Sequence, residues 1–126
     1  MRVFKNRWFE RFAAREMISD QSLCRAVRQA ESGLIDADLG GGVIKQRIPR
    51  PGEGKSGGFR SIVLFRRGEL AFFVFGFPKN AMPNIRQNEV RAFKALAEEM
   101  LGYDIAAIET ALAKGALTEV HCDDQG

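Results

Sequence analysis

The sequence is poor in the residues that build most catalytic and metal sites. Its 126 residues include one histidine, His121, and two cysteines, Cys24 and Cys122. A single histidine near the end of the chain provides neither a Ser-His-Asp triad nor a two-histidine nuclease site. The cysteines lie far apart and lack Cys-x-x-Cys spacing or companion histidines, which argues against a metal site. We therefore expect no metal and no small-molecule cofactor, and we expect Cys24 to be a small buried hydrophobic residue.

Long apolar runs are also absent. The longest strongly apolar stretch is residues 70–77, whereas a helix that crosses a membrane needs about 20 such residues. Residues 1–7 run directly into charged side chains and lack the apolar centre of a signal peptide. These observations predict a cytoplasmic protein without membrane contact.

What the chain does contain suits one small folded domain. Apolar residues make up 45% of the sequence and ten residues are phenylalanine, a composition typical of globular proteins. A chain of this length accommodates one compact domain with a single core. We expect that core to be rich in phenylalanine.

Charge is distributed unevenly along the chain. Residues 43–67 carry seven basic side chains against the single acid Glu53, whereas residues 98–126 carry seven acidic side chains against the single base Lys114. The basic residues are Lys45, Arg47, Arg50, Lys55, Arg60, Arg66 and Arg67. Such a segment favours contact with a polyanion, although arginine at strand edges also protects small sheets from aggregation.

Hydrophobic spacing predicts helices first and strands later. A short edge strand at residues 3–4 is followed by a helix over residues 7–15 and by a second helix from the N-cap Ser19 to about Ser32, ended by Gly33.

The middle of the chain is predicted to form an antiparallel meander. Residues 43–48 alternate apolar and basic side chains, and residues 59–65 resume after the Pro- and Gly-rich loop 49–58. A turn at residues 66–69 leads to residues 70–77, which are apolar on both faces and fit a covered central strand.

The C-terminal part predicts two more helices. One covers about Val90 to Met100, and a shorter one begins after Asp104 and ends at Gly115.

The expected class is α+β, with a small antiparallel sheet of three to four strands packed against N-terminal helices and with additional C-terminal helices. We place the domain at residues 1–101 and treat residues 102–126 as a short helix and acidic tail that extend it.

Two glycine motifs resemble nucleotide-binding loops and fail on spacing. Gly54-Lys55-Ser56 has Pro49 where a phosphate-binding loop has its first glycine, and a strand follows where a helix is needed. The run Gly40–Gly42 lacks the Gly-x-Gly-x-x-Gly pattern and is interpreted as a flexible hinge.

The remaining candidates for chemistry are cationic. An RNase can work without metal, because the RNA 2′-hydroxyl is the nucleophile and the protein needs only to align it and stabilise the charged transition state. The predicted neighbours suited to this are Lys45, Arg47, Lys55, Arg60 and Lys79. Alternatively, Lys45 and Arg47 form a solvated strand face. Arg60, which by strand alternation lies on the same side as Ile62 and Leu64, is then partly buried and holds a loop in place.

A family resemblance adds to this interpretation. Gly54-Lys55-Ser56-Gly57-Gly58-Phe59-Arg60, the strand that follows, and Phe73 to Asn80 together resemble the RelE/HigB-type toxins of type II toxin–antitoxin systems, which belong to the RelE/ParE superfamily. The order of elements over about residues 2–101 is similar to that family too.

The resemblance implies a ribosome-dependent mRNA endonuclease that leaves a 2′,3′-cyclic phosphate. It implies catalytic roles for Lys55, Arg60 and Lys79, and RNA contacts from Lys45, Arg47, Arg50 and Asn80. The implied partners are the ribosome, mRNA and a cognate antitoxin with an acidic or amphipathic segment. Two alternatives stay open: a ParE-like inhibitor of DNA gyrase that does not cut RNA, and a plain RNA-binding module.

Overall fold

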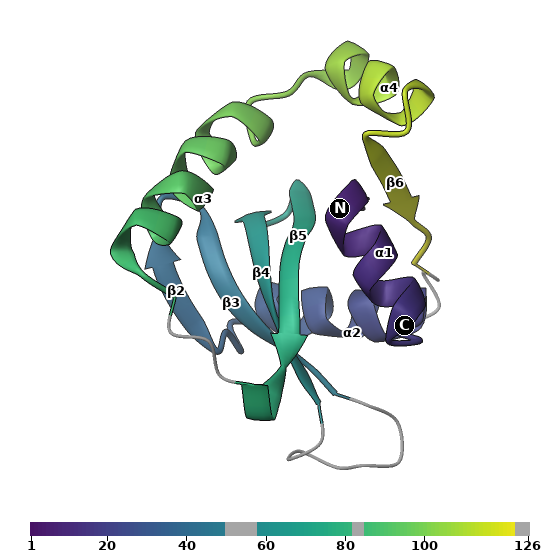
Figure 1. Ribbon diagram of the computed structural model, residues 1–126. Helices are drawn as coiled ribbons and strands as arrows, with labels where there is room; N and C mark the ends of the chain where they lie inside the picture. The colour runs from purple at the N-terminus through teal and green to yellow at the C-terminus, as the bar shows by residue number, and fades with distance from the viewer. Residues whose placement is uncertain (50–57, 82–84, 123–126) are drawn as a thin grey trace.

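The computed structural model describes residues 1–49, 58–81 and 85–122. Its helices pack around one sheet (Figure 1). The elements are β1 (Arg2–Asn6), α1 (Arg7–Arg15), α2 (Asp20–Glu31), β2 (Ala37–Gly40), β3 (Val43–Ile48), β4 (Phe59–Arg66), β5 (Leu70–Pro78), the 3-10 helix η1 (Lys79–Ala81), α3 (Gln87–Met100), α4 (Ile105–Ala113) and β6 (Leu117–Val120).

The α+β class is confirmed, but the sheet is larger than predicted. In the described residues it has six strands in the order β2-β3-β4-β5-β1-β6. β3, β4 and β5 form the expected antiparallel meander. The predicted edge strand at residues 3–4 is wrong in its placement, because β1 lies inside the sheet, parallel to β5 and antiparallel to β6.

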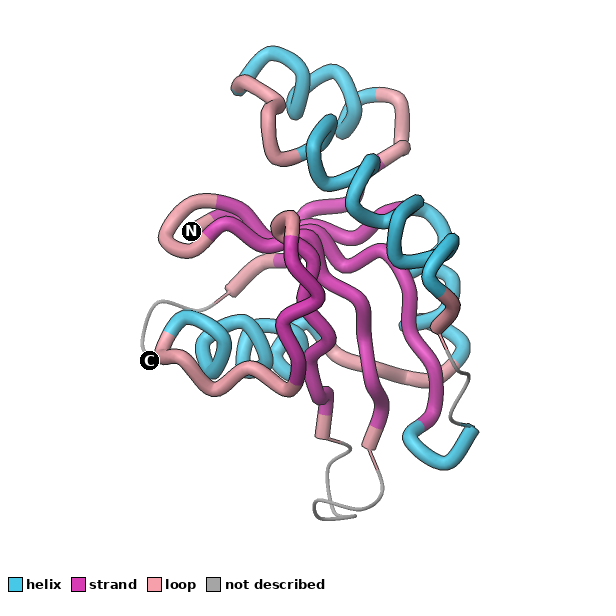
Figure 2. Tube along the Cα trace, turned by 90° about the vertical axis from the view of Figure 1, so that its left-hand side faces the viewer, coloured by secondary structure: helices cyan, strands magenta, loops and turns pink. Residues whose placement is uncertain are grey.

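Helices cover both faces of this sheet (Figure 2). On one face α1 and α2 bury Phe9, Phe12 and Leu23 against strand residues that include Phe59 and Phe73. On the other face α3 and α4 bury residues such as Ala97, Met100 and Ile108 against Val43, Ile62 and Phe72. A strand covered on both sides must be apolar on both sides, which explains the continuous apolar sequence of β5.

Local signals set most helix ends where the sequence predicts them. The Asn6 side chain accepts a hydrogen bond from the Phe9 N–H at 2.8 Å, and Ser19 accepts one from the Ser22 N–H at 3.2 Å, so both residues act as N-caps. The stretch Gly40–Gly42 is not an isolated hinge: it joins β2 to β3 as a tight turn with positive φ at all three glycines.

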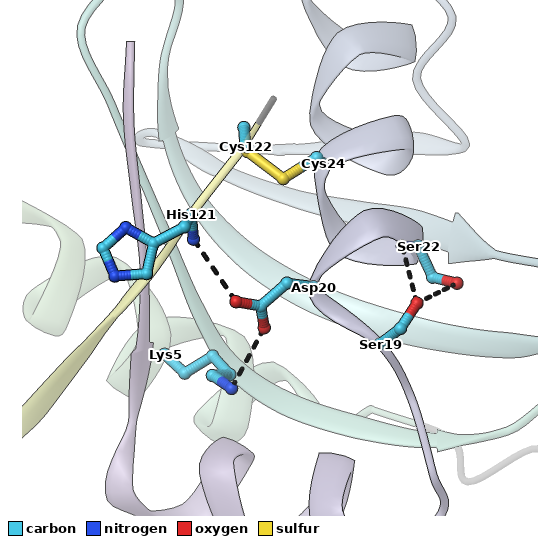
Figure 3. Close-up of a disulfide and its surroundings, with 7 residues drawn as sticks. All are labelled: Lys5, Ser19, Asp20, Ser22, Cys24, His121 and Cys122. Atoms are coloured by element: carbon cyan, nitrogen blue, oxygen red, sulfur yellow. Dashed lines mark hydrogen bonds and ion pairs between the residues drawn. A yellow bond between two sulfur atoms is a disulfide. The ribbon is translucent and has the colours of Figure 1, made fainter. Parts of the chain in front are cut away.

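Cys24 is buried as predicted, but it is not a free thiol. It forms a disulfide with Cys122, 98 residues further along the chain, with a Cα–Cα distance of 5.6 Å (Figure 3). Beside it, Asp20 lies 3.4 Å from Lys5 Nζ and accepts a hydrogen bond from the His121 N–H at 3.3 Å. The residues that directly follow β6 are thereby fastened to α2.

A second set of contacts fastens β6 to β1. Arg2 donates two hydrogen bonds to Glu119, from Nε at 3.0 Å and from Nη2 at 2.8 Å. These hydrogen bonds lower the pKa of Glu119 below its ordinary value of 4.5, against an opposing effect of burial. A carboxylate with a lowered folded-state pKa stabilises the fold above its unfolded pKa, and this contribution is lost as the pH falls through the folded pKa.

Glu119→Gln should therefore lower the free energy of unfolding at neutral pH, and the difference from wild type should shrink as the pH falls below 4.5. Because the Arg2 side chain is 37% exposed, we expect at most about 1 kcal/mol. Urea unfolding between pH 3 and pH 7 measures this, with Glu98→Gln on α3 as the control, because the Glu98 side chain is exposed. A difference that is constant with pH would contradict the assignment.

None of the helices in the described ranges is long and apolar enough to cross a membrane.

Candidate functional site

Three cationic side chains share one face of the β3–β4 hairpin. The pairing register places Arg47 opposite Arg60, and Arg60 opposite Phe77 on β5. Because side chains alternate along a strand, Lys45 and Arg47 lie on the same face as Val43, which is buried under α3 and α4. Arg60 lies on that face as well, with Ile62, as its position in the sequence predicts. We call Lys45, Arg47 and Arg60 the cationic row.

The Arg60 side chain is largely enclosed. It is 11% exposed and its Nε lies 3.2 Å from Asp36 Oδ2, which confirms the predicted partial burial. Its Nη1 is buried and, within the described part of the chain, has no hydrogen-bond partner. A buried donor without a partner costs about 1–3 kcal/mol, and in a native protein such a group is met by an ordered water, an ion or a ligand, or has a catalytic role.

The electrostatics of the row are unfavourable without an anion. Like charges directly opposite each other on neighbouring strands repel, and Arg47 and Arg60 are such a pair. Asp36 offsets one of these charges, and Lys45 adds another on the same face. The row thus retains an excess of positive charge beside a buried unsatisfied donor, an arrangement that suits a phosphate group.

The structure brings Lys79 to the end of this row. Lys79 is the first residue of η1, directly after β5, and its backbone N–H donates to the Gly58 carbonyl at 3.1 Å. Gly58 is two residues before Arg60, so the backbones at Arg60 and Lys79 lie close together, as the sequence predicts. Asn80 follows in η1 and is exposed.

Gly58 also explains how the ends of the Gly-rich segment are placed. A Cβ at Gly58 would lie 2.5 Å from the Ile48 carbonyl oxygen and 3.2 Å from Pro49 Cα, so only glycine allows the two strand ends to approach this closely. Two predicted site residues, Arg50 and Lys55, belong to the segment between Pro49 and Gly58 and lie outside the described residues.

Aromatic side chains border the row. Phe77 lies opposite Arg60, and its ring centroid is 6.2 Å from that of Phe75. The ring centroid of Phe75 is in turn 4.6 Å from that of Trp8 on α1. Trp8 is 41% exposed, whereas Phe72 and Phe73 are fully buried core residues, as expected from the sequence.

Sequence reasoning missed one member of the site, Asp36. It precedes β2 and reaches Arg60, 24 positions later, across β3. β2 itself was not predicted, so no local pattern indicated that Asp36 lies near the basic residues. In the described ranges, no group of three or more His, Cys, Asp or Glu side chains is arranged to hold a metal ion.

Comparison with known proteins supplies a family. The model of the family described as the RelE toxin of the RelE/RelB toxin–antitoxin system matches residues 1–120. The match includes β6 and so extends beyond the segment on which the sequence resemblance rested. No curated protein matches the chain significantly.

Proposed function

Because the chain belongs to the RelE toxin family, it is a toxin of a toxin–antitoxin system with an antitoxin as its partner, and we propose that it is a ribosome-dependent mRNA endonuclease. Its substrate is mRNA in the decoding site, which places its action in the cytoplasm. The observation that carries this proposal is the buried Nη1 of Arg60, which has no hydrogen-bond partner in the described ranges and belongs to a row of positive charge.

The proposed reaction uses only groups of the RNA and of this chain. The 2′-hydroxyl of the RNA attacks the adjacent phosphorus, the bond to the 5′-oxygen of the next nucleotide breaks, and a 2′,3′-cyclic phosphate and a 5′-hydroxyl result. Arg60 and Arg47 stabilise the negative charge that accumulates on the phosphate oxygens. Lys55 and Lys79 serve the proton transfers, and Lys45, Arg50 and Asn80 hold the flanking RNA.

The cognate antitoxin should cover this face. A segment with acidic side chains would be attracted to the cationic row and would compete with RNA phosphates for Arg60. Neutralisation therefore follows from occupation of the same site.

Mapping of mRNA 5′ ends after induced expression tests the proposal. Expression of the wild-type chain should produce new ends within coding regions, and co-expression of the antitoxin should abolish them. The triple variant Lys55→Ala/Arg60→Ala/Lys79→Ala should produce none, while its binding to RNA is only weakened. Gyrase-dependent DNA breaks without new mRNA ends would instead identify a ParE-like inhibitor, and unchanged cleavage by the triple variant would refute the assigned site.

A further inference from the structure

Asp36 is the only acidic side chain that the described structure pairs with the cationic row. It lies at a bend just before the edge strand β2. Its side chain is 23% exposed, and its Oδ2 lies 3.2 Å from Arg60 Nε. An ion pair this close to the candidate phosphate site either competes with the substrate or prepares the arginine for it.

The backbone N–H of Asp36 donates a hydrogen bond to a buried side-chain amide. Gln46 on β3 is 2% exposed, and its Oε1 accepts a hydrogen bond from the Asp36 N–H at 3.1 Å. Its Nε2 donates to the carbonyls of Ala26 at 3.0 Å and Leu34 at 2.9 Å. Gln46 therefore links α2, through Ala26, to Leu34 and Asp36 in the segment before β2. This holds the backbone from which the Asp36 carboxylate extends.

Asp36 approaches the Arg60 guanidinium most closely at Nε. Asp36 engages Nε, and Nη1 on the other side of the group has no protein partner in the described residues. A guanidinium presents five N–H donors in a rigid fork. Fixing it at Nε determines where the remaining donors point, and the charge of Asp36 counters the repulsion from Arg47 that would turn Arg60 away.

We propose that Asp36 is a positioning residue, which orients Arg60 toward the scissile phosphate without touching the RNA. This inference rests on the proposed nuclease function. The Gln46 amide holds the backbone of Asp36, and the Asp36 carboxylate orients the guanidinium of Arg60. Because the guanidinium is already oriented when the phosphate binds, little of the transition-state stabilisation is lost to reorganisation.

Single-turnover cleavage of mRNA on programmed ribosomes tests this inference. Asp36→Ala should lower the maximal rate by about 10- to 100-fold, as expected for a misplaced catalytic group, with little change in the protein concentration that gives half-maximal rate. Asp36→Asn, which keeps an oxygen for Nε, should retain more activity. Asp38→Ala is the matched control, because Asp38 lies two residues away and its side chain accepts a hydrogen bond from the Gly40 N–H rather than pairing with Arg60.

A double-mutant cycle separates positioning from a general effect on the fold. In the Arg60→Ala background, Asp36→Ala should have no further effect on the rate, because its action passes through Arg60. An equal loss in both backgrounds, or a wild-type rate for Asp36→Ala, would overturn the inference while leaving the nuclease function intact. Absence of cleavage by the wild-type protein would refute the proposed function itself, and the inference with it.

Discussion

Arg60→Ala should reduce the rate of mRNA cleavage by about 100- to 1000-fold, the usual cost of removing one preorganised donor to a transition-state oxyanion. The reason is structural: the Arg60 side chain is largely enclosed, and its buried Nη1 has no hydrogen-bond partner among the described residues. Single-turnover cleavage on programmed ribosomes measures the effect. Binding to the ribosome should weaken far less, because Lys45 and Arg47 remain.

Two further variants separate geometry from charge at this position. Arg60→Lys retains the charge but loses the planar fork, so it should restore only a small part of the rate. Arg66→Ala removes the same charge from the exposed end of the same strand, where Arg66 pairs with Glu69 at 3.8 Å, and should leave the rate nearly unchanged. If Arg66→Ala impaired cleavage as much as Arg60→Ala, net charge rather than the geometry at Arg60 would explain the loss.

The parts of the fold that local patterns describe could be predicted. Hydrophobic spacing, caps and turn residues predict the helices α1 and α2 and the meander β3–β5. The alternation of side chains along β4 places Arg60 on the same face as Ile62 and so predicts its partial burial. The parts that failed depend on distant partners. β2 and β6 have four residues each, too few for a periodic pattern, and β1 pairs with β5 some 68 positions later in the chain.

The same distinction between local patterns and distant partners separates the site residues that could be predicted from the one that could not. Lys45, Arg47, Arg60 and Lys79 could be selected because strand alternation and short turns bring them together within one meander. Asp36 could not, since its contact with Arg60 requires the unpredicted strand β2 beside β3. The disulfide had the same difficulty: the spacing of two cysteines excluded a metal motif, but only the position of β6 next to α2 shows that the thiols meet.

That disulfide should be the largest single covalent contribution to stability. It joins positions 98 residues apart, and in the chain-entropy view a loop of about 100 residues removes enough freedom from the unfolded state to contribute about 4.7 kcal/mol. We therefore expect the double variant Cys24→Ser/Cys122→Ser to lose about 3–5 kcal/mol of unfolding free energy. Urea unfolding without reductant measures this loss directly.

The reduced wild-type protein should match the double serine variant, and the variant itself should not respond to reductant. Titration of free thiols in the unreduced protein, unfolded in denaturant, should find none, because both cysteines are bonded. Two free thiols, or equal stability with and without reductant, would show that the bond is absent.

Catalysis should be insensitive to the same change. Cys24 belongs to the core between the sheet and α1–α2, whereas the cationic row lies on the opposite face, with the residues buried under α3 and α4. At temperatures where both proteins are folded, the double serine variant should therefore cleave mRNA at the wild-type rate. A loss of rate in the folded variant would mean that the two faces of the sheet are coupled, and that the end of the chain after β6 takes part in shaping the site.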